Sequence, residues 1–122
     1  MGVFTAAGKN ALLNEIDGLG WYIAPFNGGP SGAGTEVSSS TTEGRIALDA
    51  KLGTAASGTV SNSAAITWTA TGTITVNHVA IFSAASGGTL LGFDSVESQT
   101  ADATETIGIA IGGLDFNLTD PA

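Results

Sequence analysis

From residue 45 onward, apolar and polar side chains alternate with a period of two, and this pattern limits the possible folds more than any other feature. In RIALDAK, residues 45–51, Ile46, Leu48 and Ala50 share one face and the charged residues share the other. Successive side chains of a β-strand point to opposite faces, so the pattern predicts strands that cover a core. The same reasoning predicts strands near residues 58–62, 65–69, 72–84, 89–96 and 105–119.

The segment 72–84, GTITVNHVAIFSA, changes from half-exposed to apolar along its length. Alternation leaves Val79 and Ile81 on one face and places a larger set on the other, namely Ile74, Val76, His78, Ala80 and Phe82. This suits a strand that runs from the rim of a sandwich into its middle. Gly87 and Gly88 then supply the positive φ angles of a hairpin turn.

The last segment reverses its alternation at Gly112-Gly113. Its isoleucines occupy odd positions (107, 109 and 111), whereas Leu114, Phe116 and Leu118 occupy even ones. A bulge or a tight turn at the glycine pair would keep both halves facing the same core.

The N-terminal part predicts one α-helix, at about residues 5–17. Leu12, Leu13, Ile16 and Leu19 fall on one face at helical spacing. Thr5 is a suitable N-cap, and Gly18 suits the left-handed position after the last turn. A helix of this length is marginal alone, so we expect its apolar stripe to cover the end or edge of a sheet.

Between the helix and residue 45, WYIAPF at 21–26 predicts a strand that lies at a sheet edge or ends early, because Pro25 cannot donate a ladder hydrogen bond. The glycine- and serine-rich segment 27–44 is expected to be a mobile surface loop with a short strand at 36–40. It has glycines but no phosphate-binding motif. The whole chain, 1–122, is thus expected to be a single mainly β domain. Its fold would be an antiparallel β-sandwich or a small barrel of about eight short strands, with one N-terminal helix.

Charge and composition exclude several kinds of partner. Only Lys9, Arg45 and Lys51 oppose eleven carboxylates, for a net charge of −8. Nucleic acid and anionic membranes are therefore not expected as partners. No basic, apolar leader resembles a signal peptide, and the absence of cysteine rules out disulfides. Charged residues make up only 11% of the chain. A surface of small polar residues suits packing against other subunits, although it also occurs in ordinary β domains.

The candidate residues for chemistry are few. His78 is the only histidine, and no serine lies in a nucleophile elbow, so no catalytic residue is predicted. A zinc site would need carboxylates for its remaining ligands, and no cofactor or metal is expected. We expect the imidazole to be half-buried and to hydrogen-bond across the sheet. The alternative is a calcium- or carbohydrate-binding module, in which Asp94, Glu97 or Asp102 would converge with His78. Calcium could be bound by a cluster of these three residues and Glu105.

Several segments, in order, resemble small bacteriophage virion proteins of a putative tail-fibre or capsid-decoration family. They are GKNALLNEID, WYIAPFN with a glycine-rich loop and GTEVS, GTVSNSAAITW, VNHVAIFSAASGGTLLGFDSV and ETIGIAIGGLDFNLT. The family's G-G-Y-A-R-Q motif is represented only by Gly44 and Arg45.

The resemblance implies a non-enzymatic structural protein of the virion, made in the host cytoplasm. The expected function is a decoration subunit bound in many copies to the head, with a tail-fibre or baseplate protein as the alternative. Its partners would be the major capsid protein or other virion proteins, and self-association is expected. Trp21, Tyr22 and Phe26, beside the loop, are the candidate contact residues, although each could instead belong to the core.

Overall fold

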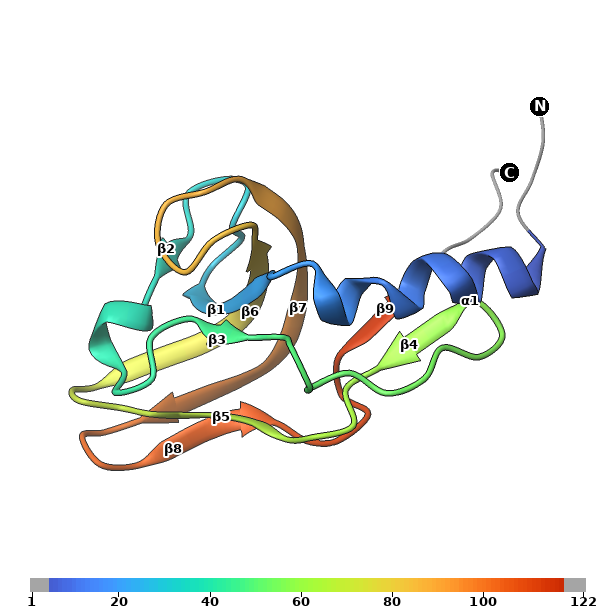
Figure 1. Ribbon diagram of the computed structural model, residues 1–122. Helices are drawn as coiled ribbons and strands as arrows, with labels where there is room; N and C mark the ends of the chain where they lie inside the picture. The colour runs from blue at the N-terminus through green and yellow to red at the C-terminus, as the bar shows by residue number, and fades with distance from the viewer. Residues whose placement is uncertain (1–4, 118–122) are drawn as a thin grey trace.

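The computed structural model describes residues 5–117 (Figure 1). One α-helix, α1 (Ala6–Asn14), leads into a 3₁₀ turn, η1 (Ile16–Gly18), and a second 3₁₀ turn, η2 (Ser38–Ser40), follows later. The described residues form nine strands: β1 (Tyr22–Asn27), β2 (Thr35–Glu36), β3 (Ile46–Ala47), β4 (Thr59–Ser61), β5 (Ile66–Thr69), β6 (Ile74–Phe82), β7 (Leu90–Ala101), β8 (Thr106–Ile109) and β9 (Asp115–Asn117).

All strand pairs are antiparallel. A five-stranded sheet has the order β2-β1-β6-β7, with β3 also paired to β1. The expectation of an edge position for the strand with Pro25 is therefore wrong: β1 has β6 on one side, while β2 and β3 pair with its two ends on the other. Two ribbons, β4-β9 and β5-β8, complete the strand set. The predicted class, a mainly β antiparallel fold with one N-terminal helix, is confirmed, and the sheets do not close into a barrel.

The main core lies between the five-stranded sheet and the β5-β8 ribbon. Trp68 of β5 is its largest fully buried side chain, with 1% of its surface exposed. Its indole Nε1 donates a hydrogen bond of 2.7 Å to the carbonyl of Gly44. A second cluster joins the helix to the β4-β9 ribbon, where Leu13 and Ile16 pack with Val60. Leu12 and Leu19, expected on the same helical stripe, are instead about half exposed.

The helix is shorter than predicted but begins where expected. The Thr5 side chain accepts a hydrogen bond from the Gly8 amide, so it is the N-cap. Asn10 and Asn14, one turn apart, accept hydrogen bonds from the amides of Gly58 and Ala55. These two bonds tie the helix to the segment before β4 and explain why Figure 1 places α1 beside β4 and β9.

Two predicted strands are largely wrong. The strand β2 covers Thr35–Glu36, so only Glu36 of the expected 36–40 region pairs. Ser38–Ser40 instead forms η2, and the Thr41 hydroxyl donates to the Ser38 carbonyl. In the 45–51 segment only Ile46–Ala47 forms a named strand. Ala50, with a φ of 62°, bends the chain away from the sheet, although Leu48 is fully buried as expected.

The assignment of faces in β6 is also corrected. The pairing with β7 is irregular between Val76 and His78, where Asn77 alone stands opposite three residues of β7, 96–98. Beyond this irregularity the alternation reverses. Val79 and Ile81 therefore join Ile74 and Val76 in the main core, and Ala80 and Phe82 belong to a separate cluster on the outer face.

At the C-terminal end, the alternation is reset by a tight turn, one of the two devices expected. Gly112 has a φ of 81°, and Gly113 donates to the Ala110 carbonyl. Leu114 returns to the core, but Ile111, expected with Ile107 and Ile109, is 68% exposed. Leu118 lies outside the described residues.

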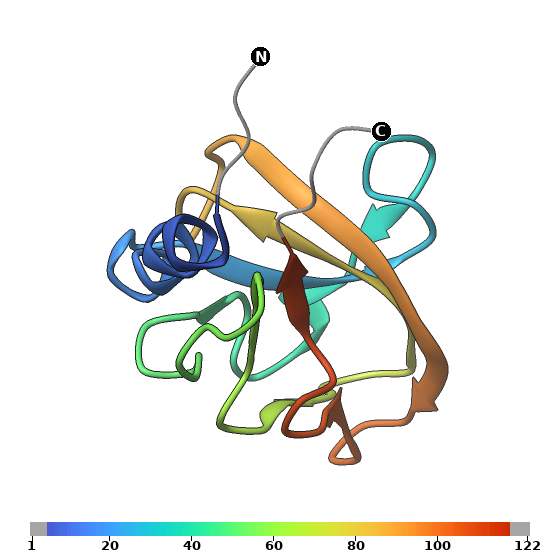
Figure 2. The same cartoon turned by 90° about the vertical axis from the view of Figure 1, so that its right-hand side faces the viewer.

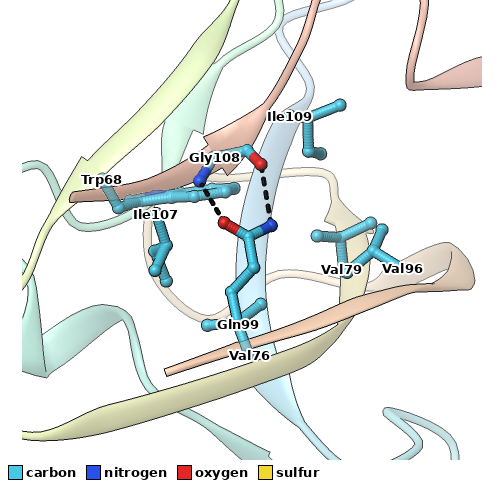
Figure 3. A pocket seen from close by; sticks show the side chains of 8 residues that line it. All are labelled: Trp68, Val76, Val79, Val96, Gln99, Ile107, Gly108 and Ile109. Atoms are coloured by element: carbon cyan, nitrogen blue, oxygen red, sulfur yellow. Dashed lines mark hydrogen bonds between the residues drawn. The ribbon is translucent and has the colours of Figure 1, made fainter. Parts of the chain in front are cut away.

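Gln99 joins the large sheet to the β5-β8 ribbon through a side chain rather than a strand ladder (Figure 3). Its Oε1 accepts from the Gly108 amide at 3.1 Å, and its Nε2 donates to the Gly108 carbonyl at 2.9 Å. Gly108 is confined on its other side, where a Cβ would lie 2.5 Å from the Ile66 carbonyl oxygen. The side-chain amide of Gln99 thus makes the two hydrogen bonds with Gly108 that the backbone of a neighbouring strand would make.

We expect Gln99→Ala to lower the free energy of unfolding by about 2 kcal/mol, because two hydrogen bonds are lost and Gly108 keeps two half-buried polar groups without partners. Urea unfolding followed by tryptophan fluorescence measures the change. Ser98→Ala, at an exposed position of the same strand, is the matched control and should stay within about 0.5 kcal/mol of the parent. Equal stability of the two variants would contradict the role assigned to Gln99.

Candidate interaction surface

His78 lies half-buried on β6, opposite Phe26 of β1 and Ser95 of β7. Its Nδ1 is 2.9 Å from Oδ1 of the adjacent Asn77. The bond that crosses the sheet belongs to Asn77, whose Oδ1 also accepts from the Gly28 amide at 2.7 Å. The expected hydrogen bond from the imidazole across the sheet is therefore wrong. His78 instead contacts the neighbouring Asn77, the side chain that ties β6 to the start of the 27–44 loop.

The acidic residues do not converge on His78. Asp102 and Glu105 lie at the turn between β7 and β8, where Asp102 accepts from Thr73 and Glu105 accepts from the Asp102 amide. Asp94 and Glu97 lie on exposed positions of β7. Over residues 5–117, no three histidine, aspartate or glutamate side chains form a group that could hold a metal ion.

The outer face of the five-stranded sheet carries aromatic side chains above small ones. Ala24 and Ala80 are fully buried in its middle, with Phe26 and Phe82 stacked beside them at 6.1 Å between ring centroids. Tyr22, paired with Phe82, is half-buried on the same face. No strand of the described residues lies over this outer aromatic face, and its margin includes the half-exposed Phe93 of β7, which pairs with Ala80.

The three aromatic contact candidates therefore occupy different environments. Trp21 is half-buried and packs against both the main core and the helix cluster. Phe26 is 6% exposed, and Tyr22 is half-buried on the outer aromatic face.

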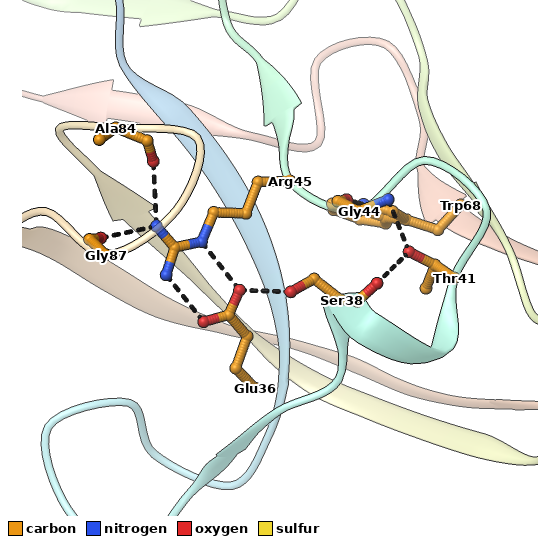
Figure 4. A network of polar contacts seen from close by, with 8 residues as sticks. All are labelled: Glu36, Ser38, Thr41, Gly44, Arg45, Trp68, Ala84 and Gly87. Atoms are coloured by element: carbon orange, nitrogen blue, oxygen red, sulfur yellow. Dashed lines mark hydrogen bonds and ion pairs between the residues drawn. The ribbon is translucent and has the colours of Figure 1, made fainter.

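Arg45 closes one side of this face (Figure 4). Its Nε and Nη2 donate to the two carboxylate oxygens of Glu36, at 2.8 and 2.9 Å, and Nη1 donates to the carbonyls of Ala84 and Gly87. The guanidinium also lies over the Phe82 ring, 3.8 Å from its centroid. One side chain thus connects β2, the 83–89 turn and the outer aromatic face.

The hydrogen bonds from Arg45 hold the pKa of Glu36 below its usual range, and a hydrogen bond from the Ser38 hydroxyl acts in the same direction. Gly44, with a φ of 65°, orients the chain ahead of Arg45 and offers its carbonyl to Trp68. Gly44 and Arg45 therefore have a structural task within this chain. Sequence reasoning missed it because nothing along the chain shows that Arg45 and Glu36 meet.

A cavity of about 200 Å³ opens between β7 and β9. Its apolar lining comes from Val79, Ile81, Phe93, Leu114 and Phe116, its walls include Gly92, and Asp94 and Asp115 also line it. We call it the β7–β9 slot. The alternation of β7 and β9 could not reveal it, since each strand alone resembles any half-exposed strand. Within residues 5–117, no helix has the length and apolar character needed to cross a membrane.

Fold and surface define a small antiparallel β protein with one N-terminal helix, an uncovered aromatic sheet face and an apolar slot. A family model described as "Podophage GP4 fiber I protein gp80" matches residues 17–117, which is most of the chain. The chain therefore belongs to this family of small phage structural proteins of the tail-fibre type. A search of curated proteins finds no match.

Proposed function

We propose that this chain is a non-enzymatic subunit of the phage tail fibre, which works by binding other virion proteins. The observation that carries the proposal is the match to a fibre protein family over nearly the whole folded part of the chain. The outer aromatic face supports it, because aromatic side chains contribute much of the binding energy at protein interfaces. The net charge of −8 favours basic partner surfaces.

Tyr22 is our leading contact among the three aromatic candidates, because its ring lies on the uncovered face while Trp21 and Phe26 pack into clusters. The proposed contact patch extends from Tyr22 to Phe93 at the margin of the same face. Self-association through this face is part of the proposal, since a fibre repeats its subunits.

Labelling of particles tests the location. A tagged copy of the chain is expressed during infection, and gold-labelled antibody is imaged on purified particles by electron microscopy. We expect label on the tail. Label spread over the head would contradict the fibre proposal and favour decoration of the capsid, with the major capsid protein as the partner. Absence of label from washed particles, with the tag exposed in the free protein, would reject a virion role.

A further inference from the structure

We infer that the β7–β9 slot receives an extended, mainly apolar segment with basic residues, supplied by another protein of the particle, which pairs as an added strand. The slot lies between the five-stranded sheet, which ends at β7, and the separate β4-β9 ribbon. In Figure 2, β9 stands with β4 on one side and β7 on the other. β9 pairs with β4 and β7 pairs with β6, so among residues 5–117 each of these two strands has a second edge without a paired strand.

An edge strand offers a row of amides and carbonyls to any chain that can lie alongside it. Proteins commonly bind extended segments in this way: main-chain hydrogen bonds supply affinity, and pockets for alternate side chains supply specificity. Here the apolar lining would receive every second side chain of the segment. Its apolar members are Val79, Ile81, Phe93, Leu114 and Phe116.

The charge of the slot indicates the chemistry of the occupant. Asp94 and Asp115 line it and both residues are exposed; the Asp115 carboxylate also accepts a hydrogen bond from the neutral Ser61 hydroxyl, which leaves its charge uncompensated. The chain has only three cationic side chains. An acidic strand would be repelled, which argues against an edge of a second copy, while lysine or arginine would pair with these carboxylates. Asp94 therefore acts both to discourage pairing between copies and to select a basic partner.

Gly92 provides a direct way to fill the slot. A Cβ built on Gly92 meets no atom within 4 Å, and this residue has none of the positive φ values that restrict other glycines. Gly92→Phe should therefore occupy the slot without disturbing the fold. Gly72→Phe is the matched control, because Gly72 is equally open and lies at the turn between β5 and β6.

The test is an array of overlapping twelve-residue peptides covering the structural proteins of the phage, including this chain, probed with the purified protein. We expect the parent to bind peptides that alternate apolar residues with lysine or arginine. Gly92→Phe should lower that binding at least tenfold, and Gly72→Phe should leave it unchanged. Asp94→Asn together with Asp115→Asn should weaken the binding and reduce its dependence on salt. Thermal unfolding checks that every variant is folded.

The inference rests on the proposed function for the source of the segment, and the two fail differently. If the protein is found on particles but binds no peptide, or Gly92→Phe binds as the parent does, the slot assignment is wrong and the virion role stands. Binding confined to peptides of this chain would replace the basic partner by a second copy. Absence of the protein from particles would remove both proposals.

Discussion

Replacing Trp68 by alanine is expected to lower the free energy of unfolding by about 3–5 kcal/mol, which is a large part of the stability of a small domain. The indole is 1% exposed and lies between β6 and the β5-β8 ribbon, so its removal leaves a cavity that the surrounding strands cannot fill. Chemical denaturation followed by far-UV circular dichroism measures the loss.

Two further variants separate the causes. Trp68→Phe keeps most of the apolar surface but leaves the Gly44 carbonyl without its donor, so we expect a loss of about 1–2 kcal/mol. Thr67→Ala, at the neighbouring exposed position of β5, should change stability by less than about 0.5 kcal/mol. A loss below 1 kcal/mol for Trp68→Ala would show that this side chain does not organise the core.

The second large effect is expected for Arg45→Ala, at about 3 kcal/mol. The side chain is 9% exposed and makes four hydrogen bonds, so truncation leaves the Glu36 carboxylate and two carbonyls without their donor. Arg45→Lys is the informative control. It keeps the positive charge but not the planar fork, and we expect it to recover less than half of the lost stability. Full recovery by lysine would mean that charge alone matters here.

The same pair predicts how stability depends on pH. Because Arg45 lowers the pKa of Glu36 in the folded protein, this carboxylate stabilises the fold above the ordinary glutamate pKa of about 4.3. That contribution is lost as the pH falls through the lowered pKa. Thermal unfolding of the parent and of Glu36→Gln should therefore differ clearly at neutral pH, and the difference should shrink as the pH falls through the lowered pKa of Glu36. A difference that stays constant over this interval would contradict the pairing.

The alternation of apolar and polar side chains predicted the strands that have one buried face and one exposed face. It placed β5 and β8 well, and it correctly predicted that the glycine pair at 112–113 would reset the chain toward the core. It failed in β6, where the pairing with β7 is irregular at Asn77 and the later side chains change faces. A bulge of this kind depends on the pairing with β7, and one strand read alone cannot reveal it.

The surface was harder to predict than the core, because it depends on residues that meet from distant parts of the chain. Arg45 reads in sequence as one of three scattered cations, yet it holds the Glu36 carboxylate and the 83–89 turn together. Trp21 and Phe26 were reasonable contact candidates by residue type, and their packing became visible only with the helix and β6 in place.

The arrangement of the first and last described elements has a mechanical consequence. α1 and β9 both contact β4, so the chain enters and leaves its fold at the same end (Figure 1). Tension applied along the backbone from both sides would first load the short β4-β9 ladder and the docked helix. The force would reach the five-stranded sheet only after the β4-β9 ladder and the helix had separated. Until then, the outer aromatic face and the contacts of Arg45 would carry little of the load.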